Sequence, residues 1–160
     1  DAGLVLLRIS DETEVREAYR TLESRAAAVG VTLDGVLVEH MVRGRREFVV
    51  GLVRDLLFGP VVMFGLGGIF TEILQDISFR HAPREARDAR EMMQEIRGHK
   101  ILDAVRGMEA ADKQRLTGML INIGRIGLEI PEVSEIDLNP VILSGANPIV
   151  VDALVILKQP

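Results

Sequence analysis

The sequence predicts an α+β fold in which helices pack against a mostly antiparallel sheet. Two observations lead to this class. Strand-like apolar runs are joined by tight turns, and helical periodicity is concentrated in the longer stretches between them, which is not the pattern of a doubly wound parallel sheet. The chain has 160 residues, 48% of them apolar. That is enough for one compact core, so we expect residues 1–160 to form a single domain.

The first third of the chain contains a helix between strand-like runs. Residues 3–9 are almost entirely apolar, which is typical of a buried strand. Residues 11–30 follow as an amphipathic helix, with a capping-box pattern of Asp and Glu at its start and a glycine at its end. We expect strands at 35–42 and 46–54, joined as a hairpin across an Arg-Gly-Arg turn.

The rest of the chain alternates short strands with helices. Residues 60–65 predict a strand, whereas 69–79 alternate poorly and fit a strand or irregular structure. A proline at the first helical position and a closing glycine delimit a helix over 83–98. A short helical turn at 100–106 and a long helix at 110–129 follow, and two strands finish the chain.

Composition excludes several classes of function. The net charge is −5, from 24 acidic and 19 basic residues, and no basic stripe carries interleaved aromatics, so nucleic acid is not an expected partner. The chain has no cysteine, which excludes disulfides, thiolate catalysis and Cys-based zinc sites. The longest uncharged run, 58–71, is too short and glycine-rich to span a membrane. We therefore expect a cytoplasmic protein with no membrane partner.

Three oxygen-bearing side chains near the C-terminus predict a metal site. Asp137 and Asn139 are two residues apart on a strand and so share a face. If a hairpin closes between Gly145 and Ala146, Asn139 lies opposite Asp152, with Cβ atoms roughly 5 Å apart. Carboxylate and amide oxygens without Cys or His suit Mg²⁺ held jointly with substrate phosphates.

A plainer interpretation of the same residues stays open. Asp-Leu-Asn-Pro can simply end a strand, because Asp and Asn favour turns and proline cannot donate to a ladder. The cost of placing unpaired carboxylates among apolar neighbours favours the metal interpretation, since a cation would offset it.

A glycine-rich turn is a second candidate site. Gly67 and Gly68 follow a strand, and their unhindered N–H groups could bind an anion, although an ordinary tight turn is the simpler explanation. The turn lacks the Gly-Lys-Ser/Thr of a phosphate loop. Glu72 lies four residues further on and could face the same ligand, or be an ordinary glutamate on a strand face.

Three residues on the expected strands could contact a nucleotide. Glu39 lies in an otherwise apolar run whose backbone could bind an adenine, with Met41 packing against the ring. Glu47 is the only acid at the start of the next apolar run and could bind ribose or support the metal site. For both acids the alternative is a solvated strand face.

Together these stretches resemble the C-terminal part of the ATP-grasp domain of ADP-forming acyl-CoA synthetases, which are related to the β subunit of succinyl-CoA synthetase. The run Phe-Gly-Pro-Val-Val-Met-Phe-Gly-Leu-Gly-Gly is highly specific to that family. The resemblance covers nearly the whole chain and rests on residues 35–42, 47–51, 53–55, 58–69, 76–80, 106–107, 137–140 and 151–153.

The resemblance implies a role for each candidate. Asn139 and Asp152 match residues that hold the Mg²⁺ of ATP, and Asp137 matches an acidic position next to the phosphates. Glu39 and Met41 match the strand against which adenine lies, and Glu47 matches an acidic position beside the nucleotide. The loop that the phosphorylated histidine segment approaches is matched by Gly67, Gly68 and Glu72.

The family's reaction joins an organic acid to coenzyme A and converts ATP to ADP and phosphate, through an acyl phosphate and a phosphohistidine. The resemblance implies that coenzyme A binds to CoA-binding and ligase domains outside this chain, in the same polypeptide or a partner subunit. The family's His-Lys motif and glycine-rich lid would precede Asp1, so we expect this piece to fold without turnover and to bind Mg-nucleotide weakly. Two alternatives stay open: the regulatory synthetase-like region of a bacterial protein lysine acetyltransferase, and a purely structural domain.

Overall fold

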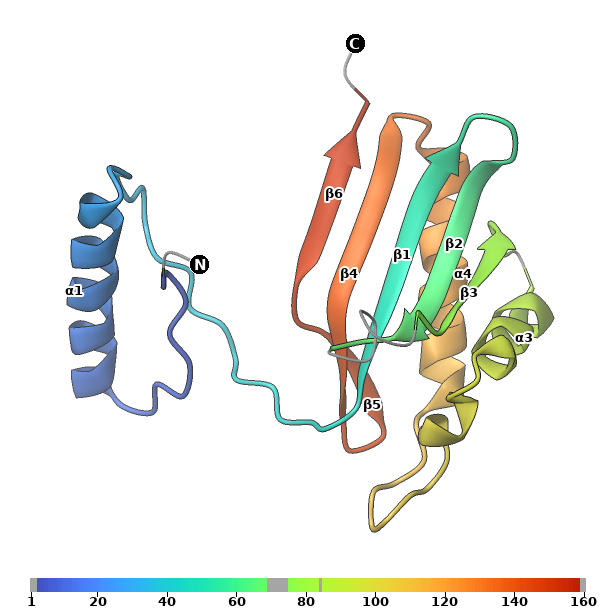
Figure 1. The fold of residues 1–160 in the computed structure, drawn as a ribbon, viewed down its shortest axis with the longest axis horizontal. Helices are drawn as coiled ribbons and strands as arrows, with labels where there is room; N and C mark the ends of the chain where they lie inside the picture. Colours follow the sequence, from blue (N-terminus) through green and yellow to red (C-terminus); the bar gives the residue numbers. More distant parts are fainter. Residues whose placement is uncertain (1–2, 69–74, 84, 159–160) are drawn as a thin grey trace. The chain divides into compact units, whose positions relative to one another are not determined.

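The computed structural model describes residues 3–68, 75–83 and 85–158, which form two compact units (Figure 1). The first unit is Asp1–Met41 and the second is Val42–Pro160. None of the helices in the described part of the chain is long and apolar enough to cross a membrane.

The first unit contains helix α1, Glu12–Ala28, as the sequence predicts. The Asp11 carboxylate caps the helix by accepting the Glu14 N–H at 2.8 Å, and the Glu14 carboxylate in turn accepts the Ser10 N–H at 2.7 Å. The first bond satisfies a backbone donor that the first turn of a helix leaves unpaired, and the second ties the residue before the cap to that turn.

The strands expected at 3–9 and 35–42 are wrong, because the structure has no strand in either segment. Apolar composition alone does not make a strand, since its backbone groups need a neighbouring strand. The apolar side chains remain exposed instead, Val5 at 77% and Leu37 at 81%. The expected hairpin between 35–42 and 46–54 is wrong for the same reason.

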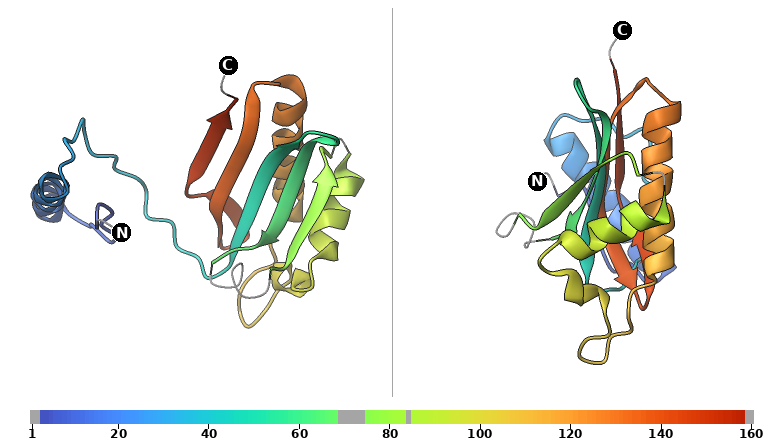
Figure 2. Two further views of the ribbon diagram at one scale, coloured as in Figure 1. Left: turned by 45° about the horizontal axis from the view of Figure 1, so that its top comes forward. Right: turned by 90° about the vertical axis from the view of Figure 1, so that its right-hand side faces the viewer.

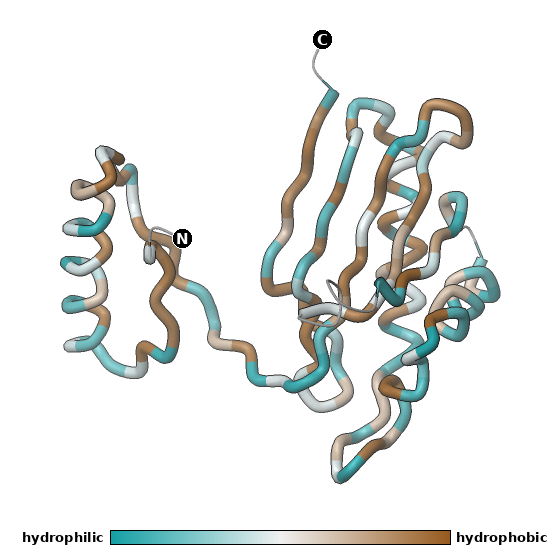
Figure 3. The backbone as a smooth tube through the Cα atoms, viewed as in Figure 1, coloured by the Kyte–Doolittle hydropathy of each residue, from teal (hydrophilic) through white to brown (hydrophobic). Residues whose placement is uncertain are grey.

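The second unit is built on an antiparallel sheet, which confirms the predicted class. The strand order is β3-β2-β1-β4-β5, and β6 also pairs with β4. The strands are β1 Glu47–Asp55, β2 Gly59–Leu66, β3 Ile77–His81, β4 Val133–Ser144, β5 Asn147–Val150 and β6 Ala153–Leu157. The last of the strands expected from the sequence is therefore two strands, β5 and β6, which residues 151–152 separate. Strand β6 is apolar along its whole length (Figure 3).

Helices α3, Ala86–Glu95, and α4, Lys113–Glu129, lie on the same face of this sheet (Figure 2). They confirm the helices predicted over 83–98 and 110–129, and a short 3-10 helix, His99–Leu102, overlaps the helical turn expected at 100–106. On the central strands, alternate residues are buried beneath the helices. On β1 these are Phe48, Val50 and Leu52, and Val49 and Gly51 between them are buried as well, whereas no residue of β6 is buried.

The opposite face of the sheet, which we call the open face, therefore carries the alternate positions of each strand. On β1 these are Glu47, Val49, Gly51 and Val53. Antiparallel partners share a face, and Gly51 pairs with Asp137 of β4, so Asp137 also lies on the open face. The folding pattern thus separates an apolar interior from a face that carries the predicted site.

Candidate functional site

The C-terminal hairpin has the predicted register. The pairs run from Val141 with Val150 to Ser144 with Asn147, and Gly145 at the turn has φ of +61°. A residue with positive φ is what tight hairpin turns require. Below these pairs the Asn139 N–H donates to the carbonyl of Asp152 at 3.2 Å. Asn139 and Asp152 are therefore opposite each other, as the sequence predicts.

A bulge in β4 lies beside this pair. Strand β1 pairs Val50 with Leu138 and Phe48 with Val141, so one residue of β1 faces two of β4, Asn139 and Pro140. Bulges bend a strand and turn side chains out of the regular alternation, often next to functional sites. Here the buried positions of β4 change from 136 and 138 to 141 and 143, while Asn139 is exposed.

Asp137 is the third member of the predicted metal set. It lies half-buried between Gly51 of β1 and Leu154 of β6. Burial raises the pKa of Asp137 above its ordinary value of 3.8, and the negative charges of Glu135 and Asp152 raise it further. The effect of Asp152 means that the two carboxylates are close enough to repel each other.

This arrangement fits a divalent cation. The described residues hold no group of three or more His, Cys, Asp or Glu side chains placed to bind a metal, so the candidate set is two carboxylates and one amide. None of the three side chains forms an ion pair in the described part of the chain. Hard oxygen ligands whose negative charge is not offset by a nearby cation suit Mg²⁺, which keeps several waters and binds together with phosphates.

The glycine turn and Glu47 form a second cluster. The Gly67 N–H donates to the Glu47 carbonyl at 2.8 Å, so this N–H is not available to an anion. A Cβ at Gly67 would lie 2.8 Å from the backbone of Glu47, and one at Gly68, where φ is +64°, would lie 2.8 Å from Glu47 Oε2. Only glycine fits at both positions. The structure thus favours a tight turn packed on Glu47 over a nest that uses Gly67.

Strand β1 connects the two clusters. Glu47 begins β1, and Gly51 pairs with Asp137 on the same face four residues further along. At about 3.3 Å per residue, the two positions are roughly 13 Å apart. Glu47, Gly67 and Gly68 therefore lie near one end of the open face, and Asp137, Asn139 and Asp152 lie further along it.

The remaining candidates are not brought into this arrangement. Glu39 and Met41 are exposed residues of the first unit, outside any strand, so the adenine-binding strand expected there is not formed. Glu72 lies outside the described residues. The roles assigned to these three residues stay predictions.

Sequence reasoning gave no role to two buried ionisable residues, Arg46 and Asp76. Both are hydrogen-bonded to backbone groups rather than to oppositely charged side chains. The only sequence signal of their burial is that each is a charged residue directly before an apolar strand.

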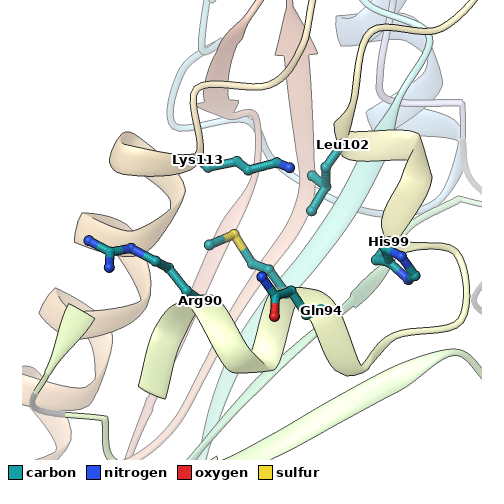
Figure 4. Close-up of a pocket in the computed structure, with 6 residues that line it drawn as sticks. Arg90, Gln94, His99, Leu102 and Lys113 are labelled. Atoms are coloured by element: carbon teal, nitrogen blue, oxygen red, sulfur yellow. The ribbon is translucent and has the colours of Figure 1, made fainter. Parts of the chain in front are cut away.

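A small cavity of about 90 Å³ lies between α3, the 3-10 helix and α4, on the face away from the site (Figure 4). Its floor is apolar and its rim is mostly polar or basic. The lining residues are Arg90, Met93, Gln94, His99, Leu102 and Lys113. Lys113 is bound to Asp103 at 2.7 Å, and the Nδ1 of His99 lies 3.1 Å from the Ile96 carbonyl. The cavity contributes nothing to the open face.

The whole pattern of strands, glycine turn and acidic hairpin corresponds to a known family. A family model described as an ATP-grasp domain matches residues 1–157. The chain belongs to the ATP-grasp domain family. This confirms the resemblance on which the roles of the site residues depend, whereas the boundary of a single domain at 1–160 stays a prediction.

Relatives of this ATP-grasp domain are ADP-forming ligases. The chain is 44% identical over 159 residues to the β subunit of ADP-forming acetate–CoA ligase I of Pyrococcus furiosus, and covers 68% of it. It is 38% identical to the ADP-forming acetate–CoA ligase I of Archaeoglobus fulgidus, and covers 23% of it. These matches take in 98% and 99% of the present chain. The chain thus spans about two thirds of a separate β subunit and under a quarter of a longer ligase.

Solved structures agree with this ATP-grasp assignment. ACD1 of Ca. Korarchaeum cryptofilum, in complex with coenzyme A, has a TM-score of 0.92 and 43% identity over 99% of this chain and 70% of that one. Acetyl-coenzyme A synthetase 1 of the same organism, with coenzyme A and Mg-AMPPCP, has a TM-score of 0.87 and 42% identity, with the same coverage. In that complex a phosphohistidine segment points towards the nucleotide binding site.

The raised pKa of Asp137 predicts a pH-dependent stability. A carboxyl whose pKa is higher in the folded state contributes stability below its unfolded value, and loses it as the pH rises through the folded value. Asp137→Asn should therefore stabilise this ATP-grasp domain relative to wild type as the pH rises above 3.8, by less than about 1 kcal/mol because solvent screens the charges. Urea midpoints of both proteins across that range measure the effect. A difference that does not change with pH would contradict it.

Proposed function

We propose that the open face of the second unit binds Mg-ATP in a full-length ADP-forming acid–CoA ligase. The observation that carries this proposal is the pairing of Asn139 with Asp152 beside the raised-pKa carboxyl of Asp137. Asn139 and Asp152 would hold the cation, and Asp137 would lie next to the phosphates. The names of the relatives, which are acetate–CoA ligases, support the reaction class.

The charges of the site explain why nucleotide and cation bind together. Asp137 and Asp152 repel each other and would also repel the phosphates of a free nucleotide. Bound Mg²⁺ would neutralise charge on the transferred phosphoryl group. The acidic pair thus favours the metal complex of the nucleotide over the free anion.

The turn at Gly67 and Gly68 would form the other end of the phosphate region. It is held against Glu47, which we propose lies beside the nucleotide, and Glu72 would act with it in phosphoryl transfer. Glu39 and Met41 would contact the adenine once their segment has a neighbouring strand. In the Mg-AMPPCP complex of the Korarchaeum relative a phosphohistidine segment points towards the nucleotide binding site, which supports phosphoryl transfer between the two.

The full-length protein would need CoA-binding and ligase domains for the complete reaction. The relatives include a separate β subunit and longer ligases, so these domains would lie in a partner subunit or in the same polypeptide. Coenzyme A would bind there rather than to this chain. The regulatory and the purely structural alternatives draw no support from these relatives.

We expect the full-length protein, with its partner subunit where one exists, to release phosphate from ATP only when an organic acid and coenzyme A are both present. The measurement is phosphate release and ADP formation over a panel of short-chain and aromatic acids. Omitting the acid or coenzyme A in turn provides the control. Nucleotide binding without phosphate release for any acid would contradict the ligase function and favour a regulatory role.

A further inference from the structure

We propose that Asp76 is a positioning residue that fixes the glycine turn for phosphoryl transfer, an inference that rests on the proposed function. Asp76 is only 6% exposed, yet it forms no ion pair in the described part of the chain. It lies immediately before β3, and Leu66 is the last residue of β2 before the glycine turn. A buried carboxylate without a cation is costly, so it needs other hydrogen-bond donors.

The donors are two consecutive backbone N–H groups. Asp76 Oδ1 accepts from the Arg97 N–H at 2.7 Å, and Oδ2 accepts from the Gly98 N–H at 2.7 Å. These residues follow α3, so the carboxylate joins the start of β3 to the end of a helix on the other face of the sheet. Only a carboxylate offers two acceptor oxygens in this geometry, because an amide would turn an NH₂ group towards one of the N–H donors.

The backbone of Asp76 transmits this anchor to the glycine turn. Its carbonyl accepts the Leu66 N–H at 3.2 Å, and the next residue, Gly67, donates to the Glu47 carbonyl at 2.8 Å. The chain entering the turn is therefore held from both sides, by β1 and by Asp76. A Cβ at Gly65 would lie 2.8 Å from the Asp76 carbonyl oxygen, so the contact is close.

Gly98 completes the anchor. A Cβ at this position would lie 2.8 Å from Leu66 Cδ1 and 3.1 Å from Asp76 Oδ2. The backbone φ of Gly98 is −79°, which alanine adopts easily. Gly98→Ala would thus press on both Leu66 and Asp76 without removing a hydrogen-bonding group. Gly98→Ala would therefore disturb the anchor by steric pressure, whereas Asp76→Asn would disturb it by removing a hydrogen-bond acceptor.

Loss of the Asp76 anchor should displace the proposed metal ligands less than it displaces the glycine turn. Asn139, Asp152 and Asp137 are held by β4 and its neighbours, and not by β3 or the segment after α3. A displaced glycine turn should slow phosphoryl transfer between the nucleotide and the histidine segment by about 10- to 100-fold, as misplacements of about 1 Å do. Affinity for Mg-ADP should change less than about threefold.

The experiment compares Asp76→Asn and Gly98→Ala with Ser78→Ala in the full-length protein. Ser78 is a matched control, because it is buried on β3 and its hydroxyl donates to the Met92 carbonyl of α3 at 2.9 Å, but it does not contact the turn. Single-turnover formation of phosphohistidine from labelled ATP measures transfer, calorimetry measures Mg-ADP affinity, and circular dichroism confirms folding. We expect slow transfer with retained affinity in the first two variants only.

Each outcome is decisive. Equal transfer rates in all three variants, or equal losses of transfer and affinity, would overturn the positioning role while leaving the ligase function intact. Unfolding of both Asp76→Asn and Gly98→Ala would also overturn it, because the anchor would then serve the fold. A wild-type protein that forms no phosphohistidine and releases no phosphate would overturn the proposed function and this inference with it.

Discussion

Replacing Asn139 with Ala, or Asp152 with Asn, is expected to lower phosphate release by the full-length protein at least about 100-fold. Even groups that only orient metal ligands cost roughly 10- to 100-fold when removed. The two residues face each other across the hairpin, so Asn139→Ala would leave Asp152 opposite an empty position, and Asp152→Asn would keep an oxygen there but remove its negative charge. Because Asp152 carries charge and Asn139 does not, excess Mg²⁺ should partly rescue Asn139→Ala and rescue Asp152→Asn less.

Asn147→Ala is the matched control for this pair. Asn147 is an exposed asparagine of the same hairpin, paired with Ser144 close to the turn and away from the three oxygen-bearing side chains. It should retain wild-type activity. Steady-state assays at several Mg²⁺ concentrations separate lost metal affinity from a lost fold, which circular dichroism monitors independently. Wild-type activity in Asn139→Ala would remove these residues from the metal site.

The hairpin could be predicted because everything that determines it is local. Gly145 supplies the turn, both arms are short and mostly apolar, and Asn139 and Asp152 are only 13 positions apart in the sequence. The register follows from where the turn closes. The break between β5 and β6 was not visible in the sequence, because the apolar run continues through residues 149–151 and resumes at Ala153.

The expected strands at 3–9 and 35–42 show the opposite case. Their apolar patterns are as strong as that of β1, but strand formation depends on a neighbour that no local pattern reveals. Glu39 and Met41 were placed on a strand by that pattern alone. Asp76 and Arg46 were missed for a related reason. Their partners are backbone groups 21 to 99 positions away, and backbone groups leave no trace in the sequence.

Arg46→Ala is expected to be the most destabilising single substitution in the second unit. Arg46 is 3% exposed and precedes β1. Its guanidinium donates to four backbone carbonyls, those of Ile101, Asp103, Glu109 and Gly145, at 2.6 to 3.3 Å. Removing it leaves these acceptors unpaired, at roughly 1–3 kcal/mol for each one that water does not reach. We expect a loss of about 3–5 kcal/mol, a large part of the stability of a typical domain.

Arg45→Ala separates this effect from a general loss of charge. Arg45 is the exposed neighbour of Arg46 and forms no hydrogen bond or ion pair in the described part of the chain, so its removal should cost less than about 0.5 kcal/mol. Arg46→Lys should lie between the two, because one ammonium group cannot reach four carbonyls. Urea unfolding of the 160-residue chain at one pH measures all three. Equal midpoints for Arg45→Ala and Arg46→Ala would contradict the prediction.

The same substitution should also weaken the metal site before the domain unfolds. One of the four carbonyls belongs to Gly145, the turn residue of the hairpin, and the backbone carbonyl of Arg46 accepts the Leu143 N–H at 3.0 Å. Arg46 thus holds the hairpin that places Asn139 opposite Asp152. In full-length protein that remains folded, Arg46→Ala should therefore lower Mg-ADP affinity, whereas Arg45→Ala should not. Unchanged affinity in folded Arg46→Ala would mean that the hairpin keeps its register without this support.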